Sequence, residues 1–87
     1  MNARRAVVNG YVQGVGFRFF ARRAALEEGI FGWVRNCPDG TVETVAEGEL
    51  AAVERYLEKL RRGPGRVTSI DVREEAATGH QTFEITR

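Results

Sequence analysis

The sequence lacks the residues that would allow covalent or metal-based stabilisation of a small fold. Its 87 residues include one cysteine, Cys37, and one histidine, His80. A single cysteine cannot form an internal disulfide, and a lone histidine in a polar stretch does not make a zinc site. The chain must therefore fold on its hydrophobic core, and its cysteine usage favours a reducing, cytoplasmic compartment.

Long apolar runs and an excess of one charge are also missing. The longest apolar stretches are only a few residues long, so we expect no membrane span, and the basic N-terminus lacks the apolar stretch of a secretory signal. Thirteen lysines and arginines oppose twelve acidic residues, which leaves a net charge of +1. A balance so near zero gives no general attraction to nucleic acid or to an anionic membrane. We therefore expect neither of them as a partner.

What is present is the composition of one globular domain over residues 1–87, with 43% hydrophobic and 29% charged residues. Segments rich in β-branched and aromatic residues predict strands at 6–12, 30–36, 41–47, 67–74 and 82–86. Apolar residues at helical spacing predict helices at 17–28 and 49–62.

This order of elements is βαββαβ with a short extra C-terminal strand. It predicts an α+β ferredoxin-like sandwich, in which two helices cover one face of an antiparallel sheet. Right-handed connections would place the first and third strands side by side at the centre of that sheet.

Several side chains outside the glycine-rich segment are expected to have structural roles only. We expect His80 to be a solvated loop residue, and Glu58 to form a surface ion pair with Arg62 one helical turn later. The leucines of the second helix are expected in the core: Leu50, Leu57 and Leu60.

Residues 10–18 carry the pattern with the clearest chemistry, because two glycines fall where a strand turns into a helix. Gly14 and Gly16 allow backbone angles that point successive N–H groups inward, and the first N–H groups of a helix have no partner inside it. Arg18 adds a permanent charge and a planar donor fork suited to phosphate or carboxylate. From the residues alone, this segment is either an anion-binding loop or a tight turn followed by a solvated arginine.

Two segments then resemble the signatures of a known family. Residues 8–18 are similar to the first signature of the acylphosphatase family, and residues 32–36, 39–43 and Gly48 are similar to the second. Both occur in the family's order and spacing, and the expected elements agree with the family fold over nearly the whole chain. Cys37 and Pro38 lie between the two parts of the second signature, at positions that we take to vary.

The resemblance implies a hydrolase that cleaves acyl phosphates to a carboxylate and orthophosphate. It implies that Arg18 binds the phosphoryl oxygens and that Asn36 positions the attacking water. It implies neither a metal nor another cofactor, and it implies no phosphoenzyme. We expect a monomer acting on a small-molecule substrate, with orthophosphate as product and competitive inhibitor. The backbone amides implied in phosphate binding are those of Gly14, Val15, Gly16, Phe17 and Arg18.

The chemistry of these residue types agrees with that implication. Phosphoryl transfer asks a protein for positioning and for stabilisation of charge on the phosphoryl oxygens, which a guanidinium and several N–H donors supply. The amide of Asn36 can hold a water but cannot take its proton, so we expect the substrate phosphate to act as the base. Asp39 and Glu43 are the only carboxylates within the two motifs, and a variant lacking both would test this expectation.

Three other functions have partial support in the sequence. The segment 13–20 has a passing likeness to the aromatic octapeptide of RNA-binding RRM domains, but that octapeptide belongs on a third strand, and Val15 replaces a stacking aromatic. A cysteine phosphatase would need an arginine six positions after Cys37, where Glu43 stands. A sensing domain that binds the anion without turning it over stays an alternative, although both proposed catalytic side chains, Arg18 and Asn36, are present.

Overall fold

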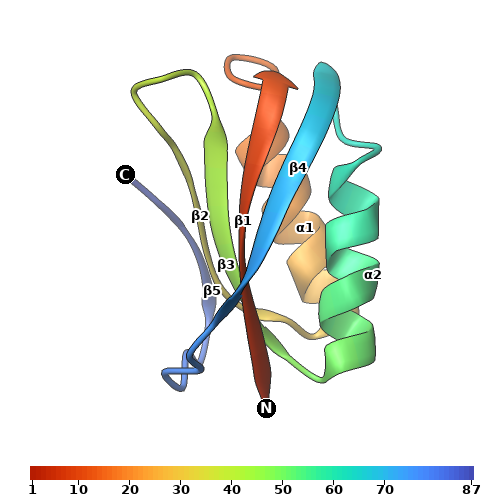
Figure 1. The fold of residues 1–87 in the computed structure, drawn as a ribbon, viewed down its shortest axis with the longest axis vertical. Helices are drawn as coiled ribbons and strands as arrows, with labels where there is room; N and C mark the ends of the chain where they lie inside the picture. The colour runs from red at the N-terminus through yellow and green to blue at the C-terminus, as the bar shows by residue number, and fades with distance from the viewer.

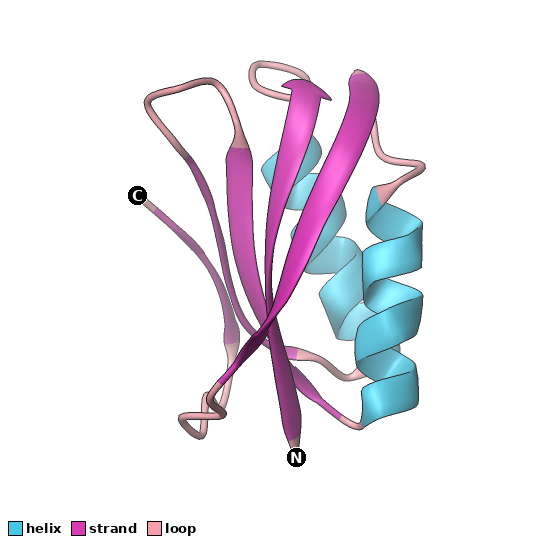
Figure 2. Cartoon of the chain, viewed as in Figure 1, coloured by secondary structure: helices cyan, strands magenta, loops and turns pink.

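The strands and helices follow one another in the predicted order in the computed structural model, which describes residues 1–87 (Figures 1 and 2). The sheet contains five strands in the order β4-β1-β3-β2-β5. The elements are β1 (Asn2–Tyr11), α1 (Phe17–Glu28), β2 (Phe31–Asn36), β3 (Val42–Gly48), α2 (Leu50–Leu60), β4 (Arg66–Glu75) and β5 (Phe83–Thr86).

The predicted two-layer arrangement is confirmed. Both helices cover one face of the sheet and leave the other face uncovered (Figure 2). From β4 through β1 and β3 to β2, each strand is antiparallel to the next, and β1 pairs with β3 as predicted. The short extra strand β5 runs parallel to β2, which makes the sheet mixed at that edge.

The core lies between the sheet and the two helices. Fifteen buried apolar residues form one cluster, with Tyr56, Phe17 and Phe83 as its largest members. Helix α1 buries Phe17 in its first turn, and the small residues Ala21, Ala24 and Ala25 let the rest of the helix approach the sheet closely. Tyr56 brings a hydroxyl into this core, and its oxygen lies 2.8 Å from the Thr44 hydroxyl. Burial of the phenol group raises the pKa of Tyr56, so this hydroxyl stays neutral.

Strand β1 begins four residues earlier than the sequence pattern indicates, at Asn2 instead of Ala6. The two arginines of this segment obscured the strand, because charged residues are uncommon in central strands. Arg5 lies on the uncovered face, where it pairs with Glu43 of β3 and Glu75 of β4. The cross-strand ion pairs therefore stabilise a charged residue within a central strand of the sheet.

Three of the expected side-chain roles are wrong. Leu50 is the first residue of α2 and is 41% exposed. Glu58 pairs with Arg61 rather than Arg62. His80 is half-buried and not fully solvated, since its backbone N–H donates to the buried carboxylate of Glu47.

No helix of this chain combines the length and the apolar character needed to cross a bilayer.

Candidate active site

The two sequence motifs meet at one end of the sheet because of the strand directions. Strands β1 and β2 are both antiparallel to β3, so they run parallel to each other and their C-terminal ends lie at the same end of the sheet. The connections 12–16 and 37–41 therefore lie at the same end of the molecule (Figure 1). In the sheet register, Val42 of β3 pairs with Val8 on one side and with Asn36 on the other.

The loop between β1 and α1 has the open, glycine-kinked geometry that the sequence predicts. Gly14 and Gly16 have φ angles of 74° and 82°, in the left-handed region where a side chain would be strained. The space beside both glycines is open, since no atom lies within 4 Å of where a Cβ would stand. The backbone N–H groups of Gly14, Val15 and Gly16 donate to no group within the protein. The loop thus offers donors on an accessible surface.

Helix α1 begins in this loop without any group to satisfy its first turn. Gly16 is the N-cap residue and supplies no side chain, and no acidic residue lies in the first turn. The first N–H groups of a helix and its dipole together favour a negative charge at this position. Arg18 lies in the same turn, is half-buried, and makes no ion pair or hydrogen bond with the protein. Arg18 and the loop therefore form a positive, unpaired surface suited to an anion.

Asn36 is the last residue of β2 and lies on the helix-facing side of the sheet. It follows Val34, a core residue, by two positions and so points to the same face. Its side-chain oxygen Oδ1 is the one buried side-chain polar atom in the chain that has no hydrogen-bond partner. Buried polar atoms are nearly always paired, so an unpaired one is a candidate for a functional role.

Gln13 connects the two motifs, and the sequence analysis assigned it no role. Its Nε2 donates to the carbonyl oxygens of Cys37 and Thr41, at 2.7 Å and 2.8 Å. These acceptors are backbone atoms of the connection that follows Asn36. The only feature of the sequence that could have indicated this role is that Gln13, with its long amide side chain, directly precedes Gly14.

The carboxylates of the second motif are already engaged. Glu43 lies on the uncovered face of the sheet, where Arg5 and Arg35 pair with it. Burial would raise the pKa of Glu43, but the hydrogen bonds and charges of these arginines hold it below the ordinary value. Asp39 accepts hydrogen bonds from the backbone and the hydroxyl of Thr41, which lower its pKa.

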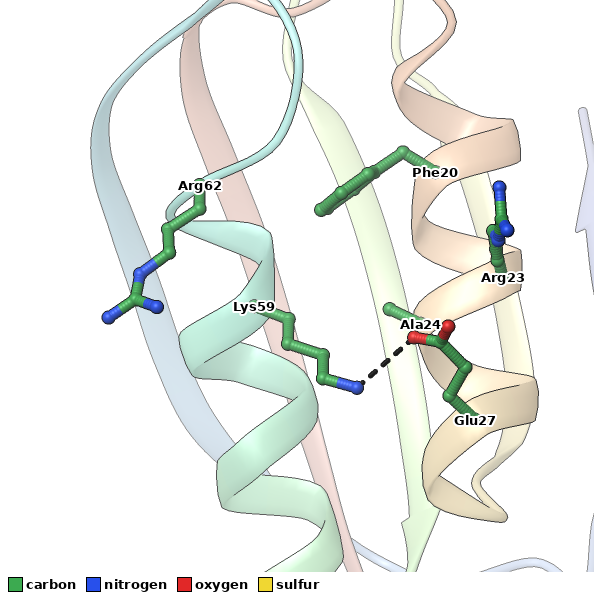
Figure 3. Close-up of a pocket in the computed structure, with 6 residues that line it drawn as sticks. All are labelled: Phe20, Arg23, Ala24, Glu27, Lys59 and Arg62. Atoms are coloured by element: carbon green, nitrogen blue, oxygen red, sulfur yellow. Dashed lines mark hydrogen bonds and ion pairs between the residues drawn. The ribbon is translucent and has the colours of Figure 1, made fainter.

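A separate hollow lies between the outer sides of the two helices (Figure 3). It has a volume of about 350 Å³, and the ring of Phe20 points into it. Lys59 pairs with Glu27 there, while Arg23 and Arg62 extend away from one another (Figure 3). Its charged groups do not converge on a common point, so this hollow is a weaker candidate than the loop.

The fold and this site thus define a small α+β protein whose strand ends are suited to a phosphorylated ligand. A family model described as Acylphosphatase matches residues 4–85. An acylphosphatase of Methylococcus capsulatus is 55% identical over 78 residues, which cover 87% of this chain and 85% of that protein. One of Acaryochloris marina is 46% identical over 85 residues, with 95% and 91% covered.

The solved structures lead to the same conclusion. The crystal structure of an acylphosphatase from Bacillus subtilis matches with a TM-score of 0.97 and 40% identity, and covers 100% of both chains. The chain therefore belongs to the acylphosphatase family. It is an enzyme, a hydrolase of acyl phosphates, and the resemblance of its two signatures is confirmed.

Proposed function

We propose that this enzyme hydrolyses acyl phosphates by direct attack of a water molecule that Asn36 positions on a phosphoryl group held by Arg18. Backbone amides of the β1–α1 loop complete the phosphate site: those of Gly14, Val15, Gly16, Phe17 and Arg18. One observation carries the proposal. Gln13 joins the loop that carries unpaired donors to the connection that directly follows an unpaired acceptor, Oδ1 of Asn36.

The proposed roles follow from what each group can do. The loop amides and the guanidinium of Arg18 can neutralise the phosphoryl oxygens, where negative charge is spread during transfer. The leaving group is a carboxylate, which departs without protonation by a strong acid. Oδ1 of Asn36 can accept a hydrogen bond from a water and so hold its oxygen in line with the bond that breaks.

The proton of the water passes to the substrate phosphate in this proposal. Asn36 cannot take it, because a side-chain amide is not a base at neutral pH. Glu43 faces the opposite side of the sheet from Asn36 and is held by two arginines. Asp39 is exposed and engaged by Thr41. These contacts support a mechanism in which the only available base belongs to the substrate.

We also propose that residues 1–87 act as a single-domain, cytoplasmic monomer that needs no cofactor. The proposed groups all come from one chain, and the only cysteine is a free, half-buried thiol. Sedimentation equilibrium at micromolar concentration should give the mass of one chain, 9.7 kDa. A dimer mass would contradict the monomer.

The direct test is hydrolysis of benzoyl phosphate, followed by the loss of its absorbance with EDTA present. We expect turnover that EDTA does not change and that orthophosphate inhibits competitively. Loss of activity in EDTA would contradict the metal-independent mechanism. The variant Asp39→Asn, Glu43→Gln should retain its rate, and a collapse of the rate in a folded variant would show that a carboxylate is the base.

A further inference from the structure

We propose that Gln13 is a positioning residue that fixes Asn36 relative to the phosphate-binding loop. This inference rests on the proposed function, because it assigns the geometry of the same site. Gln13 makes no hydrogen bond to Asn36 or to any other side chain. It acts through the backbone of residues 37–41, which follow Asn36 directly.

The contacts of Gln13 span the boundary between the two motifs. Both hydrogens of its amide nitrogen are used, one on the carbonyl of Cys37 and one on the carbonyl of Thr41. The two acceptors are 24 and 28 residues away along the chain. These are the only side-chain hydrogen bonds that join residues 12–18 to residues 36–41.

The connection that Gln13 holds is rigid in its own right. The backbone N–H of Cys37 donates to the carbonyl of Thr41, and that of Gly40 donates to the carbonyl of Cys37. Asp39 accepts two further hydrogen bonds from Thr41, from its backbone N–H and its hydroxyl. A tether to this turn therefore fixes the end of β2, including Asn36, and not a flexible tip.

The loop on the other side of the tether has no such internal hydrogen bonds. Gly14 and Gly16 have open space beside them, and residues 14–16 donate no backbone hydrogen bond. Glycines add conformational freedom, so the loop can shift relative to β2 unless another contact holds it. Displacement of a reacting group by about 1 Å can cost about 10²-fold in rate. The amide of Gln13 supplies the contact that prevents this shift.

The first test replaces the amide without changing the length of the side chain. Gln13→Met removes both donors, and we expect kcat on benzoyl phosphate to fall by about 10- to 10²-fold. The inhibition constant of orthophosphate should stay within about two-fold, because the loop amides and Arg18 remain. Equal losses of kcat and phosphate affinity would overturn the inference. Gln13 would then maintain the phosphate-binding loop itself and not the position of Asn36 relative to it.

A second variant keeps the test decisive if Gln13→Met unfolds. Gln13→Glu has nearly the same shape, but its carboxylate has no donor and faces two carbonyl oxygens. We expect it to lose more kcat than Gln13→Met, again with orthophosphate inhibition preserved. Wild-type kcat in a folded Gln13→Glu would overturn the inference. The matched control is Gln81→Met, because Gln81 is exposed and outside the site, and this variant should retain wild-type kcat.

The double variant separates positioning from a general structural effect. If Gln13 acts only through Asn36, adding Gln13→Met to Asn36→Ala should lower kcat by less than about two-fold further. A full, multiplied loss would show that Gln13 contributes independently, which overturns the inference. An inactive wild type would instead contradict the proposed function, and an active wild type with an additive double variant would contradict only the role of Gln13.

Discussion

Asn36 is the residue whose surroundings are the least explained by folding alone. Its buried Oδ1 has no partner, and leaving such an acceptor unpaired costs about 1–3 kcal/mol of folding free energy. In the proposed mechanism the attacking water is the hydrogen-bond partner of this atom, so an acceptor that weakens the fold gains a catalytic role. Removal of this atom should then raise the stability of the fold and lower the activity of the enzyme.

Asn36→Ala should therefore lower turnover without lowering stability. We expect kcat to fall by about 10²-fold, while the orthophosphate inhibition constant changes little, because only the positioning of water is lost. The melting temperature should equal or exceed that of the wild type, since the unpaired acceptor is gone. Steady-state kinetics and calorimetry measure both. A variant that fails to bind phosphate, or that melts well below the wild type, would contradict this reading of Asn36.

Arg18 differs from Asn36, because its proposed role is to bind the phosphoryl group. Arg18→Ala should lose about 10²–10³-fold in kcat/KM and most of its affinity for orthophosphate. Arg23→Ala is the matched control, since Arg23 lies on the same helix, is exposed, and makes no ion pair. Kinetics with orthophosphate inhibition compare the two. Equal, small effects in both variants would mean that Arg18 is an ordinary surface charge.

The residues of the site differ in how far the sequence could identify them. Arg18 and the glycines follow from residue type and from their position before a helix. Asn36 came only from the family resemblance, because an asparagine before a turn usually binds its own backbone. Gln13 could not be assigned, since its partners are backbone carbonyls more than twenty residues away, and such contacts leave no pattern in residue types.

At the scale of elements, Glu47 fixes the connection between β4 and β5. Its fully buried carboxylate accepts hydrogen bonds from the backbone N–H groups of Thr78, Gly79 and His80, and from the Thr78 hydroxyl. Glu47 lies four residues after Glu43 in β3 and therefore on the same face of the sheet, which the helices leave uncovered, and the connection that it binds lies over it. The expectation that His80 is solvated failed for this reason, because a distant carboxylate anchors its loop.

These hydrogen bonds to Glu47 should make the free energy of unfolding depend on pH in the acidic range. Burial would raise the pKa of Glu47, but the hydrogen bonds from Thr78 and His80 hold it below its ordinary value of 4.5. A carboxyl with a lowered pKa in the folded state stabilises the fold above that value, and the stabilisation disappears as the pH falls below it. Glu47→Gln should lose about 1–3 kcal/mol at neutral pH. Urea unfolding should show a smaller loss on acidification in the variant than in the wild type, and parallel pH profiles would refute this.

The connection from α2 to β4 supports the phosphate-binding loop from outside. Gly65 has a φ of 79°, and a Cβ there would lie 2.0 Å from the carbonyl oxygen of Tyr11 and 3.0 Å from Val15. Gly65→Ala should therefore displace the loop and weaken orthophosphate binding. Gly29→Ala is the matched control, with a similar φ of 69° but no atom within 4 Å. Calorimetric titration with phosphate should separate them, and equal binding by both variants would contradict this contact.

At the scale of the whole molecule, the arrangement of the sheet explains why the site forms where it does. Two parallel strands, β1 and β2, end together on either side of β3, and α1 begins beside them. The sequence predicted this topology well, because the order of elements and the handedness of connections leave few alternatives. It predicted the limits of β1 less well, since cross-strand pairs of Arg5 with Glu43 and Glu75 cannot be recognised before the strands are paired.

The central claim is that the β1–α1 loop captures the phosphoryl group, and backbone NMR tests it most directly. Uniformly ¹⁵N-labelled protein is titrated with orthophosphate, and the shift of each amide is followed. The largest shifts should fall on Gly14, Val15, Gly16, Phe17 and Arg18, and they should be lost in Arg18→Ala. Unchanged loop amides, with the largest shifts instead at the helix hollow of Arg23, Lys59 and Arg62, would contradict the account.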